Sequence, residues 1–289
     1  MPRIVRVALV QVALTERPGA PPAKSKKSMI DKHVEQIALA AHQGAQIICL
    51  QELFHGPYFC AEQDAKWHEV AEPIPDGIIT QLMCELARRH HVVLIVPMAE
   101  LDSPGVLYNS AAVIDADGAC LGKYRKVHIP HAPPGFWEKF YFRPGNLGYP
   151  VFETRFGKVG VYLCYDRHFP EGARALALGG AEIVFNPSAG IAGPGEAFWK
   201  IELPALAIMN QYFVAGVNRP GWEGPWKIGQ FFGTSYLCSP RGKILVEGKR
   251  AEDDLVIGDI DLDEIREFRQ ALPLSRDRRP DTYGPVTSP

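Results

Sequence analysis

Short apolar runs alternate with amphipathic helical patterns along most of this sequence, and no other feature limits the possible folds so strongly. Ile4–Leu14 and Gln46–Gln51 have the composition of strands, and Ser28–Gln43 between them carries apolar residues at helical spacing. The pattern repeats with a predicted helix at Ile78–His90 and a predicted strand at Val92–Pro97. Strands that alternate with helices predict an α/β architecture.

The middle of the chain adds hairpins to this alternation, because turn-forming segments separate pairs of apolar runs. The predicted hairpins are Leu107–Ile114 with Ala119–Tyr124, Val151–Thr154 with Val159–Cys164, and Thr234–Ser239 with Ile244–Glu247. The other predicted elements are helices at Pro170–Leu178, Gly195–Gln211 and Asp261–Gln270, and strands at Glu182–Asn186, Tyr212–Asn218 and Leu255–Ile260. The Pro-rich segments Glu16–Lys27 and Ala271–Pro289 are predicted to be a loop and a tail. Hairpins mixed with helical crossovers predict two mixed sheets that face each other, with helices outside.

Composition excludes several classes of protein. The 289 residues carry a net charge of −2, so the chain lacks the basic surplus of nucleic-acid-binding proteins. No apolar run reaches the roughly 18 residues that a membrane-spanning helix needs. The first residues lack the order of charge, apolar block and cleavage site that a signal peptide has. We therefore expect a cytoplasmic protein that binds neither nucleic acid nor membrane.

The six cysteines are too sparse for the disulfide scaffold of a small secreted protein. One of them, Cys164, ends the predicted strand Val159–Cys164, about five residues before the predicted helix Pro170–Leu178. α/β proteins place ligands at the carboxyl ends of their strands, and a nearby helix N-terminus lowers the pKa of a thiol. An isolated cysteine is commonly a core residue, but the polar Asp166–His168 beside this one keeps a reactive thiol equally open.

Two charged residues also follow predicted strands. Glu52 follows Gln46–Gln51 directly, where it is either a solvated strand end or a base whose pKa is raised by partial burial. Lys126 lies beyond Ala119–Tyr124, where it is either solvated or a cation aimed at a developing oxyanion. His128 has no acidic or cysteine partner at a recognised ligand spacing, so no metal site is predicted.

The order of these residues resembles that of the carbon–nitrogen hydrolase (nitrilase) superfamily. The resemblance covers about residues 4–265 and includes all three catalytic motifs of that family in the right order. The matching stretches are Leu50–Phe54 (LQELF), Lys123–His128 (KYRKVH), Glu138–Phe142 (EKFYF), Leu163–Glu171 (LCYDRHFPE) and Asn186–Ser188 (NPS).

The resemblance implies a four-layer αββα sandwich and a cysteine amidohydrolase that needs no cofactor. It assigns Glu52 as general base, Lys126 as oxyanion stabiliser and Cys164 as nucleophile, with Glu138 positioning Lys126 or the substrate. It also implies a hydrolase domain over residues 1–265. The tail, residues 266–289, would then contact a second subunit of a homodimer or larger homo-oligomer.

The residues around the cysteine suggest a substrate class. Arg167 is either a surface arginine or a clamp for a substrate carboxylate, which a guanidinium binds with two parallel hydrogen bonds. The backbone N–H of Tyr165 is a candidate oxyanion donor, and His128 and Asn186 complete the predicted substrate-binding set. With an arginine at this position, the sequence resembles the branch of the family that hydrolyses N-carbamoyl amino acids. We therefore expect the substrate to be a small ureido or amide acid, with N-carbamoyl-β-alanine favoured.

Other functions stay open at this point. Trp137–Tyr141 is more similar to the branch that hydrolyses N-carbamoylputrescine, and N-carbamoyl-D-amino-acid hydrolases and aliphatic or ω-amidases are further alternatives. A papain-like catalytic pair of Cys164 with His128 or His168 is another candidate enzyme mechanism. The non-enzymatic alternative is a binding module that has lost catalysis. The aromatic loop Gly221–Phe231 either lines the pocket, contacts a subunit or packs on the surface.

Overall fold

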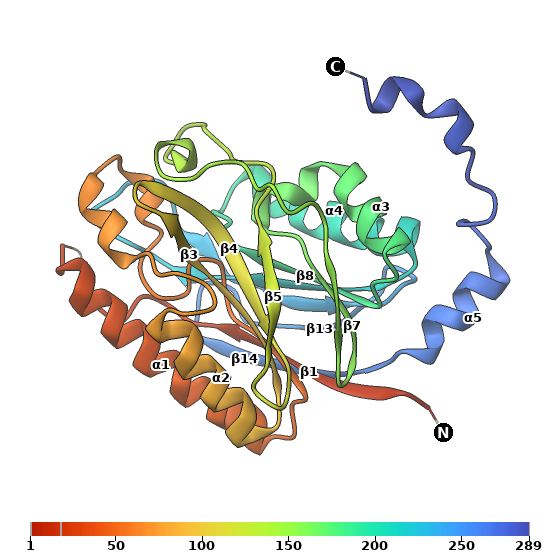
Figure 1. The fold of residues 1–289 in the computed structure, drawn as a ribbon, viewed down its shortest axis with the longest axis horizontal. Coiled ribbons are helices and arrows are strands. Elements are labelled where there is room, and N and C mark those ends of the chain that lie inside the picture. The colour runs from red at the N-terminus through yellow and green to blue at the C-terminus, as the bar shows by residue number, and fades with distance from the viewer. Residues whose placement is uncertain (1, 18, 289) are drawn as a thin grey trace.

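The computed structural model describes residues 2–17 and 19–288, which form two six-stranded mixed β-sheets packed face to face (Figure 1). The first sheet has the strand order β14-β1-β2-β3-β4-β5, in which β1, β2 and β3 run parallel and the other neighbours antiparallel. Its strands are β1 (Ile4–Gln11), β2 (Ile47–Cys49), β3 (Val93–Ser103), β4 (Val106–Ile114), β5 (Cys120–Arg125) and β14 (Asp254–Asp261).

The second sheet has the order β13-β12-β9-β8-β7-β6, with β7, β8 and β9 parallel. Its strands are β6 (Val151–Thr154), β7 (Gly157–Val161), β8 (Ile183–Ser188), β9 (Phe213–Asn218), β12 (Tyr236–Cys238) and β13 (Ile244–Glu247). A short pair, β10 (Pro220–Gly221) with β11 (Phe231–Phe232), flanks the aromatic loop. The three predicted hairpins are confirmed.

Helices cover the outer face of each sheet (Figure 1). α1 (Pro22–His42) and α2 (Ile78–His90) pack on the first sheet, and α3 (Pro170–Leu178) and α4 (Pro194–Asn210) lie on the second. The predicted αββα sandwich is therefore confirmed. α5 (Asp263–Ala271) follows β14, and the tail beyond it curves toward α3 (Figure 1).

The alternation of side chains along a strand builds this layering. In β1, Val7 and Leu9 face the core between the two sheets, whereas Ala8 and Val10 face the core beneath α1 and α2. All four side chains are fully buried. A strand covered on both faces has a nearly continuous apolar sequence, which is why the sequence shows the apolar run Val7–Val10 here.

One predicted loop is wrong in its second half, because α1 already begins at Pro22 within Glu16–Lys27. Proline is tolerated in the first turn of a helix, since its fixed φ suits the helix and no hydrogen bond needs its missing N–H. The added turns are held in place by the buried Ser25 and by Lys26, whose Nζ lies 2.5 Å from a carboxylate oxygen of Glu72.

The topology brings several strand ends to one edge. β5 runs antiparallel to β4, which runs antiparallel to β3, so β2, β3 and β5 all point the same way. Polar residues that follow β2 and β5 therefore emerge at the same edge of the first sheet. In the part of the chain that the structure describes, no helix has both the length and the apolar character to cross a membrane.

Candidate active site

A buried ammonium lies between two buried carboxylates at this edge. Lys126 follows β5, Glu52 follows β2, and Glu138 begins a short 3₁₀-helix, Glu138–Phe140. The Nζ of Lys126 is 2.9 Å from Oε1 of Glu52, and 2.8 Å and 2.7 Å from the two carboxylate oxygens of Glu138. All three side chains are fully buried, so the structure brings these three predicted residues together.

Two further residues, both missed in the sequence, hold the carboxylates in place. Asn109 in β4 donates from Nδ2 to Oε1 of Glu52 at 2.8 Å and to Oε2 of Glu138 at 3.3 Å. The hydroxyl of Tyr58 donates to Oε1 of Glu138 at 2.8 Å. Oε2 of Glu52 is buried without a hydrogen-bond partner, so one oxygen of that carboxylate is left free to take a proton.

The charges in this cluster support one another. Burial alone would lower the pKa of Lys126, but the negative charges of Glu138 and Glu52 hold that pKa well above its ordinary value. Burial raises the pKa of Glu138. The positive charge of Lys126 opposes this rise, and the negative charge of Glu52 adds to it. The ammonium therefore stays charged between two carboxylates that compete for it.

Cys164 lies three residues beyond the end of β7 and opens the 3₁₀-helix Cys164–His168. The predicted strand Val159–Cys164 is thus too long, because the chain leaves the sheet after Val161 and the carboxylate of Asp166 accepts the backbone N–H of Leu163 at 3.1 Å. Cys164 has a φ of 45°, a left-handed backbone that non-glycine residues seldom adopt and that clusters at functional sites.

The expected lowering of the thiol pKa is wrong in direction. Burial raises the pKa of the Cys164 thiol to about 11, and the negative charge of Glu52 adds to the rise, while Lys126 and Arg167 oppose it. The thiol is therefore neutral near pH 7, and its attack on a carbonyl carbon requires a base that takes the proton. The charges of Glu52 and Lys126 both affect the pKa of the Cys164 thiol, so the buried cluster and the cysteine form one candidate site.

Asp166 ties the segment after the cysteine to the first sheet. Its carboxylate accepts hydrogen bonds from the Tyr124 hydroxyl at 2.7 Å and from the backbone N–H of His128 at 2.9 Å, and it pairs with Nδ1 of His128 at 2.7 Å. The His128 ring stacks on Phe169 at a centroid distance of 3.8 Å. The structure thus places His128 in a scaffold around the cysteine, and its predicted contact with substrate stays a prediction.

Asn186 occupies a similar supporting place. Its Nδ2 donates to the backbone carbonyls of Tyr162 and Cys164, and its Oδ1 accepts from the Ser188 hydroxyl at 2.9 Å. Because the side chain is fully buried, it fixes the backbone on either side of Leu163. Its predicted role toward substrate also stays a prediction.

Cys164 opens into a cavity of about 280 Å³. Tyr165, Arg167 and His168 contribute polar groups to its wall. The apolar lining comes mainly from two loops and the start of α4, with Pro130, Ala132, Phe136, Ala189, Ile191, Ala192, Pro194 and Phe198. The cavity therefore offers a narrow apolar space with a cation next to the thiol.

Arg167 is buried rather than on the surface, with 6% of its area exposed. Its Nη1 donates to the carbonyl of Cys164 at 2.9 Å and lies 4.0 Å from Sγ. Glu202 of α4 faces both Arg167 and His168: Oε2 lies 3.3 Å from Nε of Arg167, an ion pair without hydrogen-bond geometry, and Oε1 pairs with Nδ1 of His168 at 2.7 Å.

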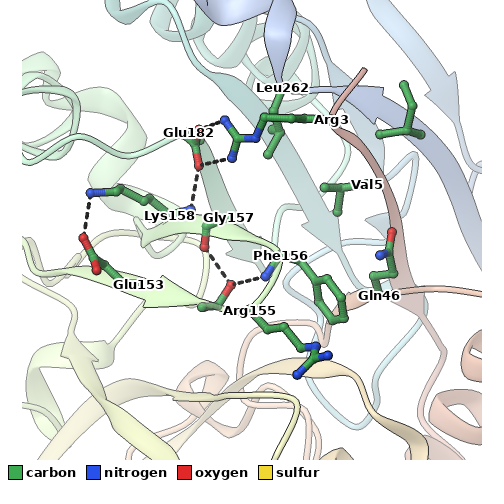
Figure 2. Close-up of a pocket in the computed structure, with 12 residues that line it drawn as sticks. Arg3, Val5, Gln46, Glu153, Arg155, Phe156, Gly157, Lys158, Glu182 and Leu262 are labelled. Carbon is green, nitrogen blue, oxygen red and sulfur yellow. Dashed lines mark hydrogen bonds and ion pairs between the residues drawn. The ribbon is translucent and has the colours of Figure 1, made fainter. Parts of the chain in front are cut away.

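A second cavity of about 490 Å³ lies elsewhere, between the start of β1 and the β6–β7 hairpin (Figure 2). Four of its charged side chains form two ion pairs: Arg3 contacts Glu182 at 2.7 Å, and Lys158 contacts Glu153 at 2.6 Å. None of the predicted site residues lines it. No cysteine is among its lining residues, and both of its carboxylates are paired with cations, so the smaller cavity at Cys164 is the candidate active site.

The aromatic loop has mixed surroundings. Phe231 is fully buried in the core next to Tyr58, whereas Trp222 is 69% exposed. Neither lines the cavity at Cys164. Among residues 2–17 and 19–288, no group of three or more His, Cys, Asp or Glu side chains is arranged to hold a metal ion.

Known proteins are similar to this chain in both sequence and fold. A sequence model of the carbon-nitrogen hydrolase family matches residues 6–270. The β-ureidopropionase of Arabidopsis thaliana is 37% identical over 98% of this chain and 72% of its own length, and the N-carbamoylputrescine amidase of the same plant is 41% identical over 86% and 87%. A carbon-nitrogen hydrolase from Helicobacter pylori G27 superposes with a TM-score of 0.87 at 31% identity, over 99% of both chains. By sequence and fold, the chain belongs to the carbon–nitrogen hydrolase family and is an enzyme that hydrolyses carbon–nitrogen bonds.

Proposed function

We propose that this enzyme removes the carbamoyl group from N-carbamoyl amino acids, with N-carbamoyl-β-alanine as the favoured substrate. The observation that carries the proposal is the shared cavity of Cys164 and Arg167, with a guanidinium nitrogen 4.0 Å from the thiol. A carboxylate held by Arg167 would bring a neighbouring carbamoyl group within reach of Sγ. The names of the two plant relatives point to the same ureido chemistry.

In the first step, Sγ of Cys164 attacks the carbamoyl carbon while Glu52 takes the thiol proton. The C–S bond forms, and the electron pair of the C=O bond moves to oxygen. Lys126 and the backbone N–H of Tyr165 then stabilise the oxyanion. One such donor typically lowers the activation barrier by about 3 kcal/mol. Glu138, bound to the same ammonium, keeps Lys126 oriented.

In the second step, the oxyanion collapses, the C–N bond breaks, and Glu52 returns its proton to the leaving nitrogen. The remaining thioester-like carbamoyl enzyme is attacked by water, whose proton goes to Glu52. Cys164 leaves as the thiol, and a carbamic acid is released. Carbamic acids decompose to an amine and carbon dioxide, so either nitrogen can leave first and the products are one amino acid, one ammonia and one carbon dioxide.

N-Carbamoylputrescine is the second candidate substrate. Such a substrate carries an ammonium where an amino acid carries its carboxylate, so it needs an anion in the pocket. Glu202 does not line the cavity at Cys164, but it pairs with Arg167 and His168, which do, and 26% of its side chain is exposed. Trp137–Tyr141 is similar to the amidases of this branch. Arg167 and Glu202 would thus favour opposite substrate charges at adjoining positions.

Ammonia release from a substrate panel tests the proposal. We expect N-carbamoyl-β-alanine to be turned over with a higher kcat/KM than N-carbamoylputrescine or simple amides. Arg167→Gln should raise KM for carboxylate substrates at least about tenfold while sparing neutral amides. The matched control is Arg155→Gln, an exposed arginine in the second cavity. Equal effects of Arg167→Gln on charged and neutral substrates would refute the carboxylate clamp.

We further propose a cytoplasmic homo-oligomer in which the tail, residues 266–289, contacts a neighbouring subunit. Tail residues such as Tyr283 and Val286, with α3 and α4, line a cavity of about 580 Å³, and Val286 is 60% exposed. Sedimentation of the full chain and of a chain ending at residue 271 tests this. An unchanged dimer after truncation would refute a role of the tail in assembly.

A further inference from the structure

A buried ion pair outside the catalytic cluster has no role in the chemistry above. Arg219 follows β9, and Glu223 lies four residues later, within the aromatic loop. Nη1 of Arg219 is 2.5 Å from Oε1 of Glu223, and the two residues are 0% and 2% exposed. Desolvating two charges is costly, and a buried pair is often replaceable by apolar residues without loss of stability. Stability alone therefore does not explain why this buried ion pair is present.

The guanidinium of Arg219 holds the backbone that carries Glu52. Its Nη2 donates to the carbonyl of Glu52 at 2.8 Å and to the carbonyl of Leu53 at 3.1 Å, and both Nη atoms reach the carbonyl of Gly56. Leu53 has a φ of 50°, a left-handed backbone that a leucine seldom adopts. The fork of Arg219 therefore pins the turn that follows the proposed general base.

Glu223 completes the arrangement on the other side. Its Oε2 accepts the backbone N–H of Tyr58 at 2.6 Å. The hydroxyl of the same Tyr58 donates to Glu138. One buried pair thus contacts the chain at both ends of residues 52–58: at Glu52 itself and at the residue that orients the second carboxylate.

We propose that Arg219 and Glu223 are positioning residues that set the placement of Glu52 and, through Tyr58, of Glu138 relative to Lys126 and Cys164. This inference rests on the proposed function, because it takes Glu52 as the base. Only a planar guanidinium can donate to several carbonyls and one carboxylate at once, so a lysine keeps the charge at this position and loses the fork.

The test is the Arg219→Lys variant, with Arg269→Lys as its matched control. Arg269 of α5 donates to the carbonyl of Gln211, which also has a left-handed φ, 56°. The Gln211 side chain bonds to the carbonyls of Phe268 and Leu272 rather than to the cluster. For Arg219→Lys we expect kcat to fall about 10- to 100-fold while KM changes less than about threefold. Arg269→Lys should keep both values.

A second readout needs no substrate. The pH midpoint for alkylation of Cys164 by iodoacetamide should move to lower pH in Arg219→Lys, because the charge of Glu52 raises the thiol pKa and a displaced Glu52 raises it less. A purely structural role would lower the thermal midpoint and leave this profile in place. Glu223→Gln, which removes the partner charge, should reproduce both changes and serves as the test if Arg219→Lys does not fold.

The outcomes separate the two proposals. If the wild-type enzyme releases no ammonia from any carbamoyl substrate, the proposed function is wrong, and the alkylation profile still tests the clamp. If Arg219→Lys and Glu223→Gln match Arg269→Lys in both kcat and alkylation midpoint, and differ only in thermal stability, the positioning role is overturned.

Discussion

Replacing Glu52 by glutamine should slow turnover strongly without weakening the fold. Oε1 of Glu52 accepts hydrogen bonds from Lys126 and Asn109, and the amide oxygen of glutamine can accept both. The cluster holds one ammonium and two carboxylates, all fully buried, so the substitution removes the surplus negative charge. It also removes the unpartnered carboxylate oxygen that we propose takes the thiol proton.

The two effects have different magnitudes. A general base contributes about 10²- to 10⁴-fold to a rate, which corresponds to about 3–5 kcal/mol in the barrier, so kcat/KM in Glu52→Gln should fall by that factor. The thermal midpoint should stay equal or rise, because Glu138 no longer shares Lys126 with a second carboxylate. Ammonia release and thermal unfolding, measured on the same preparation, check the two expectations.

The matched control is Glu100→Gln. Glu100 is equally buried, but it lies in β3 against two cations, Lys123 at 2.5 Å and Arg125 at 2.9 Å. Loss of its charge leaves these cations underpaired and should cost about 3 kcal/mol of stability while the folded enzyme keeps its activity. If Glu52→Gln instead retains more than about a tenth of the wild-type rate, Glu52 is not the base.

Three further outcomes follow from the same contacts. Iodoacetamide alkylation of Cys164 should be slow near pH 7 and rise toward pH 11, because burial raises the thiol pKa to about 11; a plateau below pH 9 would contradict this. Tyr58→Phe should cost about 2 kcal/mol in chemical denaturation and lower kcat, because Glu138 loses a hydrogen bond; an unchanged kcat would contradict it. Burial opposes ionisation of Glu100, but Arg125 and Lys123 hold its pKa below the ordinary 4.5. Its contribution is therefore present above that pH and lost as the pH falls through the lower folded-state pKa, and acid denaturation of Glu100→Gln should lack this step.

The candidate residues Glu52, Lys126 and Cys164 could be found in the sequence because each ends or follows a predicted strand, and such ends gather at one edge of an α/β sheet. Each position alone left a purely structural interpretation open, and the order of the three motifs, which resembles that of the family, singled them out. The layering itself was equally visible, since strands buried on both faces leave long apolar runs.

The supporting residues could not be found in this way. Asn109 lies within β4 and meets Glu52 across 57 positions of sequence, and Arg219 meets the same residue across 167. Such contacts depend on which strands become neighbours in the fold, and the local sequence pattern does not predict strand neighbours. The direction of the Cys164 pKa shift was missed for a related reason, because burial and the charge of Glu52, both set by the tertiary fold, outweigh the opposing charges of Lys126 and Arg167.

The pairing of β1 with β14 has a consequence for synthesis of the protein. Ile4 pairs with Asp261 and Gln11 with Asp254, so the first strand of this fold gains its edge partner only after all the other strands have been made. Cys164 follows a strand of one sheet, and Glu52, the proposed base, follows a strand of the other. Enzyme activity during translation should therefore appear abruptly and late, and a stalled nascent chain that lacks β14 would present an open strand edge for a chaperone to cover.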